Sequence, residues 1–227
     1  MLKKDEMQMN VRDIEKLGIK GFLDAEEGKA LYGLALGAST KGPVLEIGGY
    51  CGKSTVYLGL ACRKNNGILF SIDHHRGSEE QQPGQEYFDP GLFDEAEGRV
   101  NTLRLFRKAV EEAGLEDTVI PVVAHSTVVA RMWATPLSLV FIDGGHSYST
   151  VFSDYSSWMH HVMPGGYLLI HDIFTDVRDG GLAPYTMYRK ALDSGLFTEL
   201  PRVRTLGVLR RLDIGEVPEH IRSMRDY

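Results

Sequence analysis

Short apolar runs alternate with segments of helical apolar spacing along most of this chain. Continuous apolar runs of four to six residues, bounded by glycine or polar residues, are typical of buried strands. They predict strands at residues 44–47, 68–72, 119–123, 137–142 and 167–170. Apolar positions three and four residues apart predict helices before, between and after these strands. The predicted helices cover residues 25–38, 54–63, 100–113, 126–133, 149–161 and 185–194.

Strand and helix alternate five times, and this order favours a parallel sheet with helices on both faces. Residues 197–203 and 205–212 predict an antiparallel pair that closes the sheet. The expected fold is α/β and doubly wound: a Rossmann-like, mostly parallel seven-stranded sheet with a C-terminal antiparallel strand pair. A chain of 227 residues suits one such domain. We place it at residues 41–212, between an N-terminal helical extension at 1–40 and a C-terminal tail at 213–227.

The segment at residues 74–98 is long for a connection and rich in Gly, Pro, Glu and Gln. Long connections in compact domains are commonly functional lids or flexible loops. Polar side chains beside aromatic rings suit a lid over a hydroxylated ligand, and a surface loop is the alternative. The side chains in question are Glu79, Glu80, Gln81, Gln82, Tyr87 and Phe88. His74 and His75, at the start of the segment, are interpreted as ordinary loop residues.

Composition and charge argue against several classes of protein. The net charge is −6 at pH 7, so we expect no nucleic-acid partner. With two cysteines, Cys51 and Cys62, we expect no disulfide scaffold and a reducing, cytoplasmic location. The charged N-terminus does not have the pattern of a signal peptide. No uninterrupted run of about 18 apolar residues predicts a membrane span.

The most informative motif lies at residues 44–55, where an apolar run ends in an acid and a glycine-rich turn leads into a helix. Glycine lacks a Cβ atom and tolerates positive φ, so such a turn lets a small ligand approach the backbone closely. Two common nucleotide-binding motifs do not fit. A Walker A loop would need glycine at position 47, where Ile47 stands. A dinucleotide-binding G-x-G-x-x-G starting at Gly48 would need glycines in place of Tyr50 and Lys53.

The pattern that remains is E-x-G-x-x-x-G-x-S. It resembles the first motif of class I S-adenosylmethionine-dependent methyltransferases, especially the metal-dependent O-methyltransferases. The resemblance implies that Glu46 helps to hold the methionyl end of S-adenosylmethionine and that the cofactor lies against the glycine turn. It assigns cofactor binding to Glu46, Gly48, Gly49, Gly52 and Ser54.

Two further positions extend the cofactor prediction. Asp73 follows the strand at 68–72 and lies 21 residues after Gly52. An acid about 20 residues after the glycine turn binds ribose hydroxyl groups in dinucleotide-binding folds, and methyltransferases use it too; a turn-forming aspartate is the alternative. His125 and Ser126 follow the third strand, where the resembling family contacts adenine. The alternative for Ser126 is a helix cap.

Asp143 and His146, separated by two glycines after the strand at 137–142, form the second informative motif. It sharpens the resemblance to sugar and macrolide-glycoside O-methyltransferases of the macrocin type and to cephalosporin-hydroxylase-like relatives. In that group the acid binds magnesium and the histidine is the general base. This chemistry is sensible, because a hard cation favours the alkoxide of an alcohol and a neutral imidazole accepts its proton. An exposed Gly-Gly turn is the alternative.

His171 and Asp172 end the fifth strand, next to the strand that precedes Asp143. Neighbouring strands lie about 4.8 Å apart, so acids at both ends reach one ion. The resembling proteins place two acids, or an acid and an amide, at this pair of positions, and His171 departs from that pattern. We predict Asp143, His171 and Asp172 as metal ligands, with Mg²⁺ the first choice and a softer metal such as Mn²⁺ or Zn²⁺ admitted by the histidine. In the alternative, Asp172 alone is the ligand and His171 is hydrogen-bonded to backbone.

Together these residues predict an enzyme that transfers the methyl group of S-adenosylmethionine to a hydroxyl oxygen of a small acceptor, with His146 as catalytic base. The acids Glu46, Asp73, Asp143 and Asp172 are expected around one crevice at the carboxyl ends of the strands. By resemblance alone, the first acceptor is a sugar or secondary-metabolite glycoside, and a catechol or other phenol is second. The rivals are a nucleotide-dependent hydroxylase or oxidoreductase and a non-catalytic methyltransferase-like scaffold. A homodimer is an arrangement that the sequence leaves open.

Overall fold

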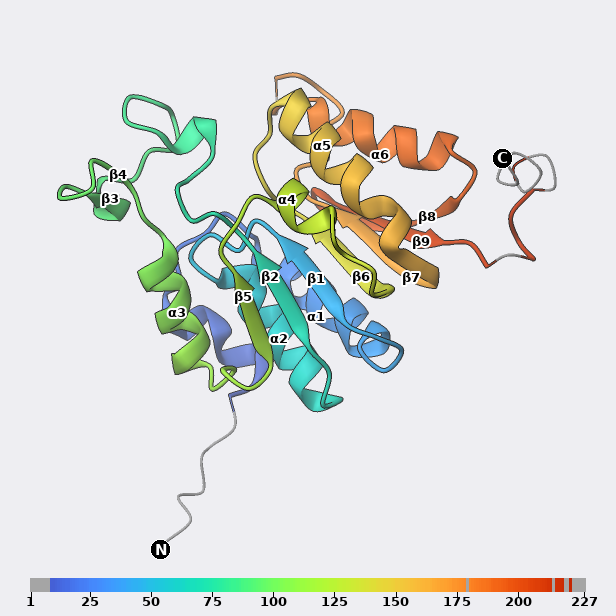
Figure 1. Ribbon diagram of the computed structural model, residues 1–227, viewed down its shortest axis with the longest axis horizontal. Coiled ribbons are helices and arrows are strands. Elements are labelled where there is room, and N and C mark those ends of the chain that lie inside the picture. The colour runs from blue at the N-terminus through green and yellow to red at the C-terminus, as the bar shows by residue number, and fades with distance from the viewer. Residues whose placement is uncertain (1–8, 179, 214, 219–220, 222–227) are drawn as a thin grey trace, which may run out of the picture.

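A computed structural model describes residues 9–178, 180–213, 215–218 and 221. Its main feature is a seven-stranded sheet in the order β5-β2-β1-β6-β7-β9-β8 (Figure 1). The first five strands in this order are parallel, and β9 and β8 are antiparallel additions at one edge. The predicted mostly parallel, seven-stranded fold is therefore confirmed. Its strands are β1 (Val44–Ile47), β2 (Leu69–Ile72), β5 (Val119–Val122), β6 (Leu137–Ile142), β7 (Val162–Ile170), β8 (Phe197–Val203) and β9 (Leu206–Arg211).

Helices cover both faces of this sheet (Figure 1). One face carries the short helix η1 (Val11–Leu17) with α1 (Ala25–Ala38), α2 (Lys53–Lys64) and α3 (Leu103–Glu112). The other face carries α4 (Ser126–Ala130), α5 (Tyr148–Trp158) and α6 (Ala183–Asp193), with a single 3-10 turn, η4 (Met159–His161), after α5. Each face therefore has its own apolar core. Among the described residues, no helix combines the length and apolar character that crossing a bilayer requires.

A capping box fixes the start of α1. The Asp24 carboxylate accepts from the Glu26 backbone N–H at 2.7 Å, and the Asp24 N–H donates to the Glu27 carboxylate at 3.2 Å. Leu31 and Ala35 are buried in the same core as α2. The N-terminal extension thus packs into the main domain. Residues 1–8 of that extension, and 214, 219–220 and 222–227 of the tail, lie outside the described residues.

The segment at residues 74–98 contains local structure that the sequence did not predict. It contains two 3-10 turns, η2 (Glu79–Gln81) and η3 (Pro90–Leu92), and the strand β3 (Phe93–Asp94), which pairs with β4 (Arg99–Val100) in a separate two-stranded sheet. Elements of two or three residues are too short to produce a readable apolar period. Leu92 packs with Cys51 in a small apolar cluster. This contact anchors the segment against the glycine turn.

Candidate active site

The glycine turn after β1 lies directly against the backbone that follows β6. Gly48 has φ +94°, and a Cβ atom there would lie 2.0 Å from the carbonyl oxygen of Asp143. Gly52 has φ +97°, and a Cβ atom there would lie 3.0 Å from the Cβ of Ala109. A side chain at position 48 would therefore need both a strained φ and space that the neighbouring strand end occupies. Glycine is required at this point, as the motif indicates.

Glu46 lies underneath this turn. Its carboxylate is fully buried and accepts hydrogen bonds from the hydroxyls of Ser54 at 2.5 Å, Thr55 at 2.6 Å and Ser71 at 2.6 Å. Burial raises the pKa of Glu46 to about 7, although the three hydroxyls act in the opposite direction. Glu46 lines neither of the cavities described below. These hydrogen bonds join β1, β2 and the start of α2, so Glu46 stabilises the glycine turn from below.

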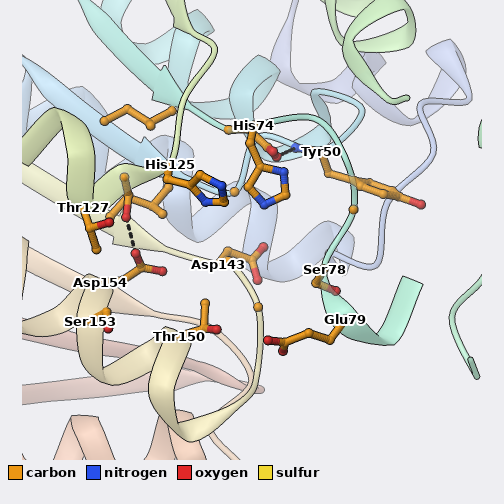
Figure 2. Close-up of a pocket in the computed structure, with 18 of the residues that line it drawn as sticks. Tyr50, His74, Ser78, Glu79, His125, Thr127, Asp143, Thr150, Ser153 and Asp154 are labelled. Carbon is orange, nitrogen blue, oxygen red and sulfur yellow. Dashed lines mark hydrogen bonds between the residues drawn. The ribbon is translucent and has the colours of Figure 1, made fainter. Parts of the chain in front are cut away.

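A first cavity of about 570 Å³ opens at the carboxyl ends of β1, β2, β5 and β6 (Figure 2). Asp73 helps to shape it, because its two carboxylate oxygens accept from the backbone N–H groups of Tyr50 at 2.8 Å and His75 at 2.6 Å. A carboxylate has about four acceptor positions, so both oxygens can still accept from a ligand. The predicted site residues that line this cavity are Gly48, Asp73, His125, Ser126 and Asp143.

Two histidines lie next to each other in the wall of the first cavity (Figure 2). The ring centroids of His74 and His125 are 4.7 Å apart, with 49° between the ring planes. Burial lowers the pKa of His74, and the nearby Asp73 carboxylate opposes that shift. Aromatic faces at this position suit a flat ligand. His125 was predicted as a binding residue, whereas His74 was missed because no local motif marks it.

Asp154 of α5 also lines the first cavity and carried no signal in the sequence. It is 5% exposed, and its carboxylate accepts a hydrogen bond from the Ser126 hydroxyl (Figure 2). Burial raises the pKa of Asp154 to about 6, against the effect of that hydrogen bond. A Cβ atom on Gly144 would lie 3.0 Å from Asp154 Oδ2, so glycine at 144 leaves room for the carboxylate. A single aspartate within a helix is unremarkable until the fold places it against a cavity.

A second cavity of about 570 Å³ shares a wall with the first. The residues that line both are Gly48, Tyr50, Gln81, Asp143 and Gly144. Phe22, Tyr50 and Tyr87 supply aromatic rings to the second cavity, with the Phe22 ring 6.0 Å from Tyr50 and 5.4 Å from Tyr87 between centroids. Residues 77–87 contribute to the walls of both cavities, which agrees with a lid role for the segment at 74–98.

The other residues predicted to bind the cofactor, Gly49, Gly52 and Ser54, do not line the first cavity. Gly49 and Ser54 line the second cavity, and Gly52 lines neither. A Cβ atom on Gly49 would lie 2.5 Å from the Ser71 hydroxyl, so this glycine is required by the packing of the turn. The four acids expected around one crevice are therefore divided: Asp73 lines the first cavity, Asp172 the second and Asp143 both, and Glu46 lines neither.

Three side chains at the ends of β6 and β7 form a group suited to a cation. One ligand atom from each of Asp143, His146 and Asp172 lies within 4.8 Å of the others. Asp172 has φ 58°, a left-handed conformation that is uncommon for a residue other than glycine. Two carboxylates and one imidazole are the donors that divalent first-row metals take, whereas Mg²⁺ prefers oxygen alone.

His171 lies behind these three side chains rather than among them. Its Nδ1 is 3.1 Å from Asp143 Oδ1, and its Nε2 is 3.0 Å from Glu27 Oε2. Both nitrogens thus face carboxylates, and the predicted role of His171 as a ligand does not match this placement. Burial lowers its pKa, but Asp143 and the other acids outweigh burial and raise it far above the ordinary value. The contact with His171 Nδ1 holds the Asp143 carboxylate in position. Its partner Glu27, which no sequence motif marks as a site residue, also accepts from the Thr205 backbone N–H at 2.8 Å.

His146 connects the second cavity to the segment at 74–98. Its Nδ1 is 2.9 Å from Glu80 Oε2, and its Nε2 is 2.7 Å from Asp172 Oδ2. Burial lowers the pKa of His146, but the two carboxylates outweigh that effect and raise it to about 9. Glu80 and His146 are 66 residues apart, so only the fold brings them together.

Comparison with known proteins identifies the family. The family described as Methyltransferase domain matches residues 45–173, which is more than half of the chain. The chain belongs to this methyltransferase family. It is an S-adenosylmethionine-dependent methyltransferase of class I, as the glycine turn led us to expect.

Solved structures of methyltransferases share this fold. An O-methyltransferase from Bacillus cereus in complex with S-adenosylhomocysteine matches with a TM-score of 0.62 at 13% identity, over 94% of each chain. TomG from Streptomyces achromogenes, an O-methyltransferase of tomaymycin synthesis in complex with S-adenosylmethionine, matches with 0.58 at 16% identity, over 94% of this chain and 92% of that one. Cofactor-bound Rv0187 from MTB matches with 0.58 at 17%, over 89% of this chain and 87% of that one. These likenesses show the architecture.

Proposed function

We propose that this methyltransferase transfers the methyl group of S-adenosylmethionine to a hydroxyl oxygen of a small acceptor, with help from a divalent cation. The observation that carries this proposal is the pair of cavities that meet at Gly48, Asp143 and Gly144. One cavity has the size and strand-end position of a nucleoside site, and the other contains the group suited to a cation. Methyl transfer needs two ligands whose reacting atoms meet, and a shared wall provides that meeting point.

The first cavity is assigned to the cofactor. Asp73 accepts from the ribose hydroxyls, the paired rings of His74 and His125 lie against the nucleobase, and Gly48 allows close approach of the methionyl part. Asp73 is already held by two backbone N–H groups, so it is oriented before the cofactor binds. Prior orientation reduces the entropy that is lost when the reacting groups come together.

Asp143 and Asp172 are assigned to the cation. Two carboxylates with ligand atoms within 4.8 Å fit Mg²⁺ or Mn²⁺, and His146 in the same group favours the softer Mn²⁺ if it is also a ligand. When bound, the cation would supply positive charge that favours ionisation of the acceptor hydroxyl. His171 keeps Asp143 oriented through the 3.1 Å contact, and Glu27 in turn orients His171.

His146 is assigned as the general base. Its Nδ1 is 2.9 Å from Glu80 and its Nε2 is 2.7 Å from Asp172, so the two carboxylates fix the ring, and Nε2 becomes the basic atom when Asp172 is bound to the cation instead. The base needs a neutral imidazole, and its pKa of about 9 in this arrangement reflects two uncompensated carboxylates. Positive charge held by Asp172 would offset one of them and lower that pKa. Glu80 then acts as a positioning residue for His146.

The second cavity is assigned to the acceptor, and a hydroxylated sugar or glycoside is our first choice. Glu80, Gln85 and Glu86 provide hydrogen-bonding groups, and Phe22, Tyr50 and Tyr87 provide apolar faces for a sugar ring. The same three rings favour a catechol or another phenol as the second candidate. A cytoplasmic location and the absence of a nucleic-acid partner remain predictions from composition.

Ligand binding separates this function from its rivals. Isothermal titration of the purified full chain should show binding of S-adenosylhomocysteine and none of NAD. NAD binding without S-adenosylhomocysteine binding would favour the oxidoreductase reading. Turnover is then measured with a panel of glycosides and catechols, and a protein that binds cofactor but methylates no hydroxylated acceptor would be the non-catalytic scaffold.

Cation binding has its own test. Electron paramagnetic resonance with Mn²⁺ measures binding without turnover, and Asp172→Asn should weaken the affinity of the full chain about 10-fold or more. Exposed Asp117→Asn, which makes the same chemical change far from the cavities, should leave it unchanged. Equal Mn²⁺ affinity in all three proteins would contradict the cation assignment.

A further inference from the structure

Three aromatic rings line the outer wall of the second cavity. Phe22 precedes α1, Tyr50 belongs to the glycine turn and Tyr87 belongs to the segment at 74–98. The plane of the Phe22 ring makes 33° with Tyr50 and 80° with Tyr87, so the three rings present faces in different directions. Phe22 is 64% exposed and Tyr87 is 45% exposed. Large aromatic side chains with this much free surface beside a cavity are suited to contact with a ligand.

The same wall carries negative charge. Glu80 and Glu86 both line the second cavity, and the Tyr87 backbone N–H donates to the Glu80 carbonyl at 3.1 Å. The Glu80 carboxylate is 2.9 Å from His146 Nδ1, whereas no ion pair within the described part of the chain includes Glu86. The Glu86 carboxylate is the main cause of a raised pKa of the Tyr87 hydroxyl, and burial and Glu80 contribute to it. The Tyr87 ring therefore lies in a negative potential.

The lysines of this cavity do not neutralise that charge. Lys20 Nζ lies 2.5 Å from Asp89 Oδ2, and Asp89 does not line the cavity. Lys53 Nζ lies 3.4 Å from Glu15 Oε2, and Glu15 does not line it either. A divalent cation would offset the two aspartates proposed to bind it, but not Glu86. The outer wall thus combines aromatic faces with a carboxylate, an arrangement that attracts an organic ammonium group from two sides.

We propose that the acceptor carries a positively charged amine, as amino sugars do, and that Phe22, Tyr87 and Glu86 bind this amine. This inference rests on the proposed function, with the second cavity as the acceptor site. A protonated amine has no lone pair, so methyl transfer stays on a hydroxyl oxygen of the same acceptor. The C–O bond forms as the C–S bond of the sulfonium breaks, and the hydroxyl proton passes to His146. Acceptors with a carboxylate or phosphate at this position are repelled by Glu86.

The test compares two probes that have the same shape and differ in charge. Choline carries a permanent positive charge, and 3,3-dimethylbutan-1-ol has carbon in place of its nitrogen. Ligand-observed NMR titration of the full chain, with S-adenosylhomocysteine and Mg²⁺ present, should show that choline binds about 10-fold more tightly, as expected for a cation–π contact assisted by one carboxylate. Equal affinity for the two probes, or binding of neither, would overturn this inference, while bound S-adenosylhomocysteine in the same sample would still support the proposed function. Failure of S-adenosylhomocysteine to bind would overturn both.

Variants then locate the group that prefers the charged probe. Glu86→Gln keeps the size of the side chain and removes its charge, so the preference for choline should shrink about 3-fold. Tyr87→Leu removes the ring, and the preference should shrink about 3- to 10-fold. Glu116→Gln is the matched control, at an exposed position that lines neither cavity, and should keep the wild-type preference. An unchanged preference in one variant would overturn the role of that residue, and an unchanged preference in both would overturn the inference.

Discussion

The two cavities of this methyltransferase are built in different ways. The first is bounded mainly by residues that directly follow β1, β2, β5 and β6, so the sheet fixes its shape. The second is bounded largely by segments from distant parts of the chain, including residues 20–23, 80–81, 85–87 and 171–172. On the proposed assignment of the two cavities, cofactor binding would depend on the frame of the fold, and the choice of acceptor would depend on segments that can vary without disturbing the sheet.

The largest effect is expected where the two cavities meet. Asp143→Ala removes a proposed cation ligand from the shared wall and takes away the carboxylate 3.1 Å from His171 Nδ1. The methyl-transfer rate should fall about 10³-fold or more, because several kcal/mol of charge stabilisation are lost. Rates of the variant and the wild type are measured with Mg²⁺ and with a chelator. Full activity of Asp143→Ala that a chelator does not change would defeat the cation assignment.

A change in the glycine turn should disturb both cavities together. Gly48→Ala places a Cβ atom 2.0 Å from the Asp143 carbonyl at φ +94°. Strain and displacement should lower the free energy of unfolding by about 3 kcal/mol and weaken the binding of S-adenosylhomocysteine. Gly33→Ala is the matched control, since nothing lies within 4 Å of a Cβ atom there and the helix should tolerate it. Urea unfolding and calorimetry check both variants, and equal stability of the two would contradict the close approach.

The stability of the fold should depend on pH through Glu46, which is buried beneath the glycine turn. The pKa of Glu46 is raised by burial from 4.5 to about 7, so the folded state holds a proton that the unfolded state releases. This contribution to stability is complete below about pH 4.5 and is lost as the pH rises through 7, with a magnitude of about 1–3 kcal/mol. Relative to Glu46→Gln, the wild type should therefore lose stability between pH 5 and about 8. Urea unfolding across this range checks it, and parallel curves for the two proteins would refute the shift.

The smallest effect is expected at the outer wall of the second cavity. Phe22 is 64% exposed and lies against Tyr50 and Tyr87. Phe22→Ala should raise the KM for the acceptor about 3- to 10-fold and leave the affinity for S-adenosylhomocysteine unchanged, because Phe22 lines the second cavity and not the first. Met132→Ala, at an exposed position that lines neither cavity, is the control. A change in cofactor affinity with no change in acceptor KM would reverse the assignment of the two cavities.

The sequence predicts the first cavity better than the second for a physical reason. Gly48, Asp73, Ser126 and Asp143 each follow a strand that its apolar run identifies, and parallel strands bring their carboxyl ends to one edge. The alternation of strands with helices, and the parallel sheet that it implies, follow from the same runs. The order of the strands within the sheet comes from the structure.

The contacts that the sequence did not predict join residues far apart in the chain. Glu80 meets His146 across 66 residues, and Glu27 meets His171 across 144. Glu27 belongs to the capping box of α1 and Glu80 to the predicted lid, but neither local setting indicates a histidine partner so far away in the sequence. Asp154 was missed for the same reason, because only the packing of α5 against α4 brings it to Ser126.

One crystallographic measurement tests the central assignment most directly. Crystals of the full chain grown with S-adenosylhomocysteine and Mn²⁺ would locate the metal by anomalous scattering and the cofactor product by its density. We predict a manganese peak between Asp143 and Asp172, and the product in the first cavity with its sulfur at the wall shared with the second. A product molecule in the second cavity, or a manganese ion away from both aspartates, would contradict the account.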